Sequence, residues 1–286
     1  MKKTAFFLIA SIGLLASCDV IEDPIIPVTT NYDEATYGPP PSFGAPEDLT
    51  RNVLLEDFTA HQCGNCPAAA IVAEALEDTY GQDICVVAIH SGSLAATNEE
   101  GAFTTDWTNE ISDIYYNQLD FQANPLGRVN RSPSLGTFLF PVEWEPLVED
   151  IITENVEVAL QIATNYSDQN NEVNIHVNGQ FQESSPGNLK LAVLVLESHI
   201  IDYQLDYSSD PEVIPDYEFN HVLRDAVTGP FGLDFSINAE DGDEVQKNYT
   251  YEWNNAWQVE NASIVAFVYD NETGQVINTV KTYITQ

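Results

Sequence analysis

Two cysteines separated by two residues, Cys63 and Cys66, constrain the fold of this chain more than any other feature. They follow residues 52–58, an apolar run typical of a strand, and precede residues 68–77, whose apolar spacing and helix propensity predict a helix. Cys63 is therefore expected next to a helix amino terminus, where free N–H groups and the helix dipole favour a thiolate. Cys66 is expected one turn further on, where it can attack a mixed disulfide.

The residues around this dithiol resemble the thioredoxin pattern. The matching positions are Asp57, Phe58, Ala60, Cys63, Gly64 and Cys66. The resemblance implies that Cys63 is the nucleophile, that Cys66 resolves the mixed disulfide, and that Asp57 is a buried acid that moves protons on and off Cys66. Two residues depart from the pattern, because Gln62 replaces a tryptophan and Asn65 replaces a proline. These departures leave the redox strength and the choice of partner open.

The same resemblance implies a cis-proline opposite the dithiol, at the start of a later strand, where it seats the substrate. The candidate is Pro125, which follows Asn124. Its spacing from Cys66 is longer than usual because residues 91–123 include an inserted segment, with a helix expected over residues 105–119. The alternative for Pro125 is an ordinary trans proline in a turn.

The other cysteines narrow the possible pairings. If Cys18 is lipidated, three cysteines remain, and an odd number cannot close a disulfide framework. One Cys63–Cys66 pair then leaves Cys85, which lies in the apolar run 84–89 and is expected to be a buried free thiol. With only two closely spaced cysteines, a zinc site is disfavoured, and we expect neither a metal nor a cofactor.

The amino-terminal residues carry a targeting signal. Residues 1–17 combine two lysines with a short apolar run and are interpreted as a signal peptide. They end before Cys18 in a sequence that resembles a lipobox, which implies that Cys18 becomes lipidated; the alternative is an ordinary signal with an incidental cysteine. The proline-rich residues 18–47 are expected to form an extended tether. We therefore expect a lipid anchor in the outer membrane, on either its periplasmic or its surface face.

The strongly acidic composition excludes one class of function. The chain has 9 Lys and Arg against 45 Asp and Glu, a formal net charge of −36. This charge repels phosphate backbones, so we expect no nucleic-acid partner. The acidic residues 240–244 lack the ligand spacing of an EF-hand, and a solvated turn is favoured over a calcium site.

In the second half of the chain, apolar residues recur with a different period than in the first half. From residue 155 apolar and polar residues alternate, which predicts strands separated by polar turns. Seven strands are expected, over residues 156–164, 172–181, 189–197, 219–227, 245–253, 263–269 and 276–284. The predicted architecture is a thioredoxin-like domain over residues 48–154, followed by an immunoglobulin-like β-sandwich over residues 155–286.

The whole chain resembles one family, the lipoproteins related to the twenty-eight-kilodalton outer membrane protein of Gram-negative anaerobes. The best markers are residues 63–67, 88–92, 124–131 and 219–224. The resemblance implies an outer-membrane location and a role in binding or adhesion.

Two functions stay open. Thiol–disulfide exchange with protein thiols or disulfides requires a Cys63 sulfur that is open to solvent. A surface binding protein with a structural disulfide would bury that bond and present an apolar patch on its sandwich to a protein ligand. His61, two residues before Cys63, is either a cation that stabilises the thiolate or a solvated loop residue.

Overall fold

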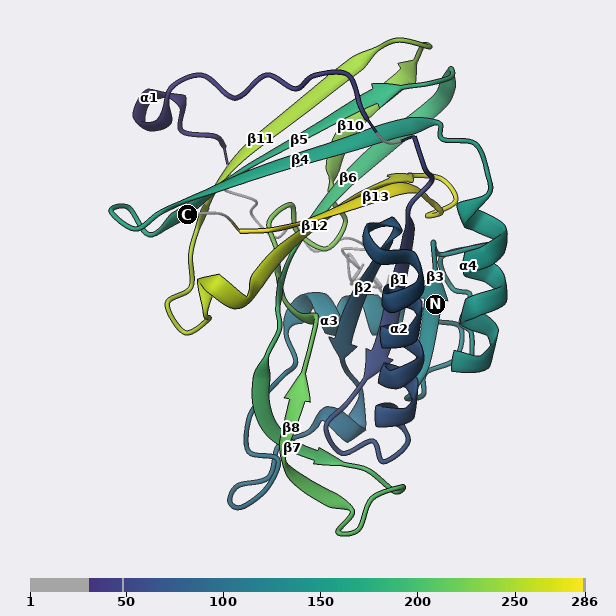
Figure 1. Ribbon diagram of the computed structural model, residues 1–286, viewed down its shortest axis with the longest axis vertical. Helices are drawn as coiled ribbons and strands as arrows, with labels where there is room; N and C mark the ends of the chain where they lie inside the picture. Colours follow the sequence, from purple (N-terminus) through teal and green to yellow (C-terminus); the bar gives the residue numbers. More distant parts are fainter. Residues whose placement is uncertain (1–30, 48, 285–286) are drawn as a thin grey trace, which may run out of the picture.

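The computed structural model describes residues 31–47 and 49–284 and is a mixed α/β structure in which strands predominate (Figure 1). The helices are α1 (Glu34–Tyr37), α2 (Cys66–Tyr80), α3 (Glu110–Asn117) and α4 (Trp144–Ile152). The strands are β1 (Val53–Thr59), β2 (Ile84–His90), β3 (Leu126–Val129), β4 (Val158–Ser167), β5 (Glu172–Phe181), β6 (Ser185–Glu197), β7 (Ile200–Leu205), β8 (Val213–Phe219), β9 (Val222–Ala226), β10 (Leu233–Ala239), β11 (Glu244–Glu252), β12 (Ala262–Asp270) and β13 (Val276–Tyr283). The signal peptide and Cys18 lie outside the described residues.

A single sheet runs through both halves of the chain. Its order is β13-β12-β6-β9-β2-β1-β3, and β10 also pairs with β6. The junction is β9, which pairs with β6 on one side and, in parallel, with β2 on the other. The expected boundary at residues 154/155 falls between α4 and β4, but the sheet continues across it. The division into two domains therefore stays a prediction.

The strand predictions for the second half were correct but incomplete. All seven expected segments contain strand, and the bounds of β5 agree with the prediction. Three further strands, β7, β8 and β10, were not expected. In the first half, Leu139 makes one isolated bridge to Gly127 at the start of β3.

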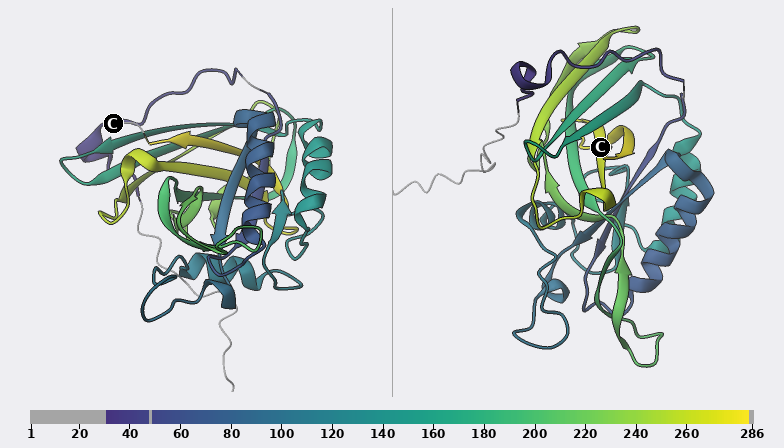
Figure 2. Two further views of the ribbon diagram at one scale, coloured as in Figure 1. Left: turned by 60° about the horizontal axis from the view of Figure 1, so that its bottom comes forward. Right: turned by 60° about the vertical axis from the view of Figure 1, so that its left-hand side comes forward.

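Helices cover both faces of the β1–β3 region (Figure 2). Helices α2 and α4 pack on one face through Ala73, Leu76 and Trp144. Helix α3 packs on the other face through Ile111 and Tyr115. Helix α2 ends at Gly81, whose positive φ of 59° is a conformation that glycine adopts without strain.

The remaining strands form two smaller sheets. The three-stranded sheet β11-β5-β4 packs against the central sheet and encloses a core of aliphatic and aromatic side chains. Residues 31–47, part of the expected tether, lie against this sheet, since Asp33 N–H donates to Thr250 Oγ1 and the Tyr37 hydroxyl donates to Glu172 Oε2. Strands β7 and β8 form a separate hairpin at the bottom of Figure 1.

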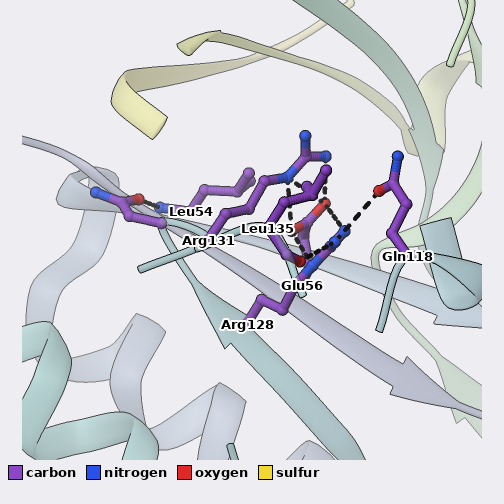
Figure 3. A network of polar contacts seen from close by, with 7 residues as sticks. Leu54, Glu56, Gln118, Arg128, Arg131 and Leu135 are labelled. Carbon is purple, nitrogen blue, oxygen red and sulfur yellow. Dashed lines mark hydrogen bonds and ion pairs between the residues drawn. The ribbon is translucent and has the colours of Figure 1, made fainter. Parts of the chain in front are cut away.

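A buried charge cluster links β1 to β3 and to the residues that follow it (Figure 3). The cluster also contacts the second half of the chain. Glu56 on β1 accepts hydrogen bonds from Arg128 Nη2 at 2.9 Å and from Arg131 Nη2 at 2.7 Å. The Arg131 guanidinium also lies 4.9 Å from the ring centroid of Phe267 on β12. Burial by itself raises the pKa of Glu56, but the two guanidinium groups outweigh it and hold that pKa below its ordinary value.

We predict that Glu56→Gln destabilises the fold strongly, because it leaves two buried guanidinium groups without a counter-charge. The expected loss in the free energy of unfolding is about 3–5 kcal/mol, measured by urea denaturation. The control is Glu154→Gln, because the Glu154 side chain is 51% exposed where it pairs with Arg51. Its expected loss is below about 1 kcal/mol. Equal losses in the two variants would contradict the prediction.

Candidate functional site

The dithiol lies where β1 passes into α2, as the sequence predicts. Cys63 is in the connecting loop and Cys66 is the first residue of α2. The two cysteines form a disulfide, with their Cα atoms 5.3 Å apart. Cys85 is a buried free thiol, and burial raises its pKa to about 11. The predicted assignment of these three cysteines is confirmed.

The disulfide is covered, which differs from what exchange requires. Cys63 and Cys66 are each only 2% exposed. On one side they pack against Ala60 and against Ala95, which lies in the turn after β2. In this conformation the Cys63 sulfur therefore lacks the opening to solvent that exchange requires, and the bond is buried, as the alternative of a structural disulfide predicts.

The rest of the cover comes from the β7–β8 hairpin. The N–H of Leu205 donates to the carbonyl oxygen of His61 at 2.8 Å, and the N–H of Tyr207 donates to that of Gly64 at 2.9 Å. The side-chain amide of Gln204 donates to the carbonyl oxygen of Cys63 at 3.1 Å. The hairpin is thus bonded directly to the loop that carries the first cysteine.

The position of the Tyr207 ring explains why residue 64, between the two cysteines, is a glycine. A Cβ atom added at Gly64 would lie 2.6 Å from two carbon atoms of this ring, which is closer than carbon atoms approach. Gly64 has no positive φ, so the close ring and not the backbone conformation excludes a side chain.

Asp57 is a buried acid behind the disulfide, as the resemblance implies. It is 3% exposed, and its Oδ1 atom has no hydrogen-bond partner among the described residues. Burial raises the pKa of this carboxyl to about 7. Asp57 and Cys66 line one small cavity of about 40 Å³, together with His90 and Gln204. The acid and the second cysteine are therefore neighbours.

A larger groove reaches Asp57 from another direction. It has a volume of about 550 Å³ and lies between α2 and strands β2, β8 and β13. Its lining includes Asp57, Glu74, Tyr217, His221 and Lys281. Burial and then the nearby Asp57 raise the pKa of Tyr217 to about 12, so its hydroxyl stays protonated. Asp57 therefore lies at the wall of a groove that is formed partly by β8 of the hairpin.

Two histidines near the disulfide are also buried. His61 is fully buried, with Nε2 2.9 Å from the carbonyl oxygen of Ala96, so the interpretation as a solvated loop residue is wrong. His90 packs between Trp107 and Phe219. Burial lowers the pKa of His90 to about 3, and the ring is neutral at physiological pH. His90 also lines the small cavity that Cys66 lines.

The Asn124–Pro125 bond is cis, which confirms that prediction. Pro125 precedes β3, and its neighbour Leu126 pairs with Phe58 at the end of β1. The Asn124 side chain donates to the carbonyl oxygens of Thr59 at 3.0 Å and Ser91 at 2.8 Å. Pro125 is therefore held at the edge where β1 and β2 end, the edge from which the cysteine loop leaves the sheet.

Sequence reasoning missed the residues that the second half contributes. Gln204 and Tyr207 carry no motif, and the bond from Gln204 to Cys63 spans 141 positions. Within the described parts of the chain, no group of three or more His, Cys, Asp or Glu residues is arranged to hold a metal ion. No helix in residues 31–47 and 49–284 has the length and apolar character needed to cross a membrane.

Solved structures share this arrangement of helices and strands. HBP35 of Porphyromonas gingivalis is 16% identical, with a TM-score of 0.63 over 83% of this chain and 76% of that chain. A protein from Agrobacterium tumefaciens is 10% identical, with a TM-score of 0.52 over 84% of this chain and 97% of that chain. At such low identities these likenesses show the fold alone.

The family is shown by the sequence. The family model described as outer membrane protein Omp28 matches residues 112–286, more than half of the chain. The chain therefore belongs to the Omp28 family of outer membrane proteins, and its location is the outer membrane. A domain of the outer membrane lipoprotein Omp28 from Porphyromonas gingivalis is 25% identical over 46% of this chain and 89% of that domain, with a TM-score of 0.32. No curated protein matches this chain.

We predict that Asp57→Asn stabilises the protein increasingly as the pH rises from about 4 to about 7. The folded-state pKa of Asp57 is raised from 3.8 to about 7. In this window the unfolded chain therefore loses the Asp57 proton while the folded chain keeps it, and wild-type stability falls. An asparagine has no proton to lose, so the gain in the free energy of unfolding reaches about 4 kcal/mol near pH 7.

The measurement is the difference in urea unfolding between Asp57→Asn and the wild type at several pH values. Asp113→Asn, at an exposed position in α3, serves as the control for loss of a surface carboxylate. A difference for Asp57→Asn that stays constant with pH would show that this carboxyl does not titrate in the window.

Proposed function

We propose that this outer membrane protein carries out thiol–disulfide exchange with protein thiols through Cys63 and Cys66, in a conformation in which the hairpin has moved aside. The supporting observation is Asp57, a buried carboxyl with an unpartnered oxygen that shares a cavity with Cys66. Burying a polar atom without a partner costs roughly 1–3 kcal/mol. A purely structural disulfide gains nothing from such a group.

The pKa of Asp57 suits the chemistry of the second cysteine. When the disulfide opens, Cys66 leaves as a thiolate within a mostly apolar environment and requires a proton. An acid with a pKa of about 7 can both give and take a proton near neutral pH. The groove on the other side of Asp57 supplies the exchange of protons with solvent.

The proposed exchange balances in two steps. A thiolate of a dithiol protein attacks Cys63 Sγ, the Cys63–Cys66 bond breaks, and the departing Cys66 thiolate takes the Asp57 proton. The second thiolate of the substrate then attacks the substrate sulfur that is bonded to Cys63. This forms a disulfide within the substrate and releases Cys63 as a thiolate. The substrate is oxidised by two electrons and the cysteine pair is reduced; the reverse sequence reduces a substrate disulfide. Pro125 is proposed to seat the substrate strand.

The division into domains and the membrane anchor are part of the same proposal. Residues 48–154 are proposed to be a thioredoxin-like domain, and residues 155–286 an immunoglobulin-like β-sandwich whose strands continue the first domain's sheet. Residues 1–17 are proposed to be a signal peptide, with a lipid on Cys18 as the membrane anchor.

A second candidate is a surface binding protein in which the disulfide is structural. The 2% exposure of both cysteines favours it. The described residues also include a cluster of aromatic side chains, Phe121, Phe138 and Phe140, with ring centroids 5.6 and 6.3 Å apart. Phe121 and Phe140 are more than half exposed. This cluster lies in the first half of the chain, whereas the sequence-based alternative placed the binding patch on the sandwich.

The two candidates predict different results for cysteine variants. If exchange occurs, Cys66→Ser accumulates mixed disulfides at Cys63 with a substrate protein that carries a disulfide, because the Cys63 thiolate attacks that disulfide and the resolving cysteine is missing. Cys63→Ser accumulates few, because the attacking cysteine is missing. The measurement is non-reducing electrophoresis after acid quenching, together with the reduction potential of the Cys63–Cys66 pair. Cys85→Ser, which removes a buried thiol, is the control. A potential too low for exchange, without mixed disulfides in either variant, supports the structural disulfide.

A further inference from the structure

We infer that the backbone carbonyls of residues 61–64 form a docking edge for an extended peptide segment that carries a side-chain amide and, three residues later, an aromatic ring. Residues 204–207 of the hairpin occupy this edge in the observed conformation. The inference rests on the proposed function for the chemistry that follows docking, whereas the docking itself needs no redox step.

The main-chain contacts come from Leu205, the last residue of β7, and from Tyr207 in the turn that follows. The two N–H donors come from alternate residues, Leu205 and Tyr207, and alternate N–H groups of an extended chain point to the same side. Their acceptors are the carbonyl oxygens of His61 and Gly64. Any extended polypeptide presents N–H groups with this spacing, so the edge can accept a segment of another protein by the same bonds.

The side chains define the preferred sequence. Gln204 is 2% exposed, and its amide reaches the carbonyl oxygen of Cys63 itself. The Tyr207 ring covers the flat surface left by Gly64 while the residue remains 59% exposed. One contact therefore requires an amide donor, and the other accepts a planar ring because no Cβ is present. A segment docked in this register brings its own neighbouring residues next to Cys63.

The present occupant is held less firmly at its tip than at its base. Strands β7 and β8 pair only with each other among the described strands, and the base of the hairpin is anchored by Phe219, which packs with Trp107 and Val222. Most residues from 206 to 213 are exposed. An incoming segment replaces the hydrogen bonds that the hairpin tip makes to the loop. Displacement of the tip is therefore a near-balanced exchange that also uncovers the disulfide.

The first arm of the test measures how fast dithiothreitol reduces the disulfide in the full-length protein in mild detergent. Gln204→Ala/Tyr207→Ala removes both side-chain contacts, and we expect reduction to be about tenfold faster than in the wild type, the effect of about 1.4 kcal/mol. Gly64→Ala acts from the other side of the contact, because its Cβ meets the Tyr207 ring, and is expected to accelerate reduction as well. Ile201→Ala, an exposed position on the same strand facing Glu218, is the control and is expected to leave the rate unchanged.

The second arm measures docking without chemistry. The probe is a fluorescein-labelled synthetic peptide with the sequence of residues 200–209, which contains no cysteine. We expect it to raise the fluorescence polarisation with the Gln204→Ala/Tyr207→Ala protein and to bind more weakly when the corresponding Gln and Tyr of the peptide are replaced by alanine. Thermal unfolding of each protein variant verifies that it is folded.

The outcomes separate the inference from the proposed function. The docking edge is overturned if the reduction rate is unchanged in the folded Gln204→Ala/Tyr207→Ala and Gly64→Ala variants. It is also overturned if the peptide binds equally well after its Gln and Tyr are replaced by alanine. Faster reduction with specific peptide binding, but without mixed disulfides at Cys63, supports the docking edge and rejects exchange.

Discussion

The buried cluster of Glu56, Arg128 and Arg131 is the constraint on which the rest of the structure depends. It fixes β1 against β3 and, through the ring of Phe267, against β12 in the second half of the chain. Successive side chains of a strand point to opposite faces, so holding Glu56 on one face directs Asp57 to the other. Glu56 meets two cations and is ionised, whereas Asp57 meets none, and burial raises its pKa to about 7. The same strand thus supplies a structural charge and a titrating acid.

Chain connectivity explains why the disulfide is covered. Strands β6 and β9 are antiparallel neighbours in the central sheet, and the β7–β8 hairpin is inserted in the connection between them. Since β9 also pairs with β2, this connection emerges beside the end of the sheet that carries the cysteine loop. The central sheet therefore brings the hairpin to the disulfide without a separate domain interface. A movement of the hairpin leaves the pairing of β6, β9 and β2 intact.

The environment of the disulfide combines tight packing with polar groups that lack partners. Within the described structure, Asp57 Oδ1, His61 Nδ1 and both ring nitrogens of His90 make no hydrogen bond. Unpartnered buried atoms are uncommon in folded proteins and concentrate where strain or chemistry requires them. Their gathering around one disulfide, beneath the β7–β8 hairpin, connects the proposed exchange with the proposed docking edge.

The sequence by itself determined the local elements of this protein. Strand alternation, helix spacing, the Cys63–Cys66 pair, the buried Cys85 and the cis bond before Pro125 depend on neighbouring residues or on a recognisable motif, and they could be predicted. Tertiary structure alone decided that the two halves share one sheet, that Glu56 lies between two arginines, and that Gln204 and Tyr207 cover the cysteine loop. These contacts join residues between about 70 and more than 140 positions apart. Periodicity and propensity describe a residue's own segment, whereas burial of Cys63 depends on which distant segment the fold places above it.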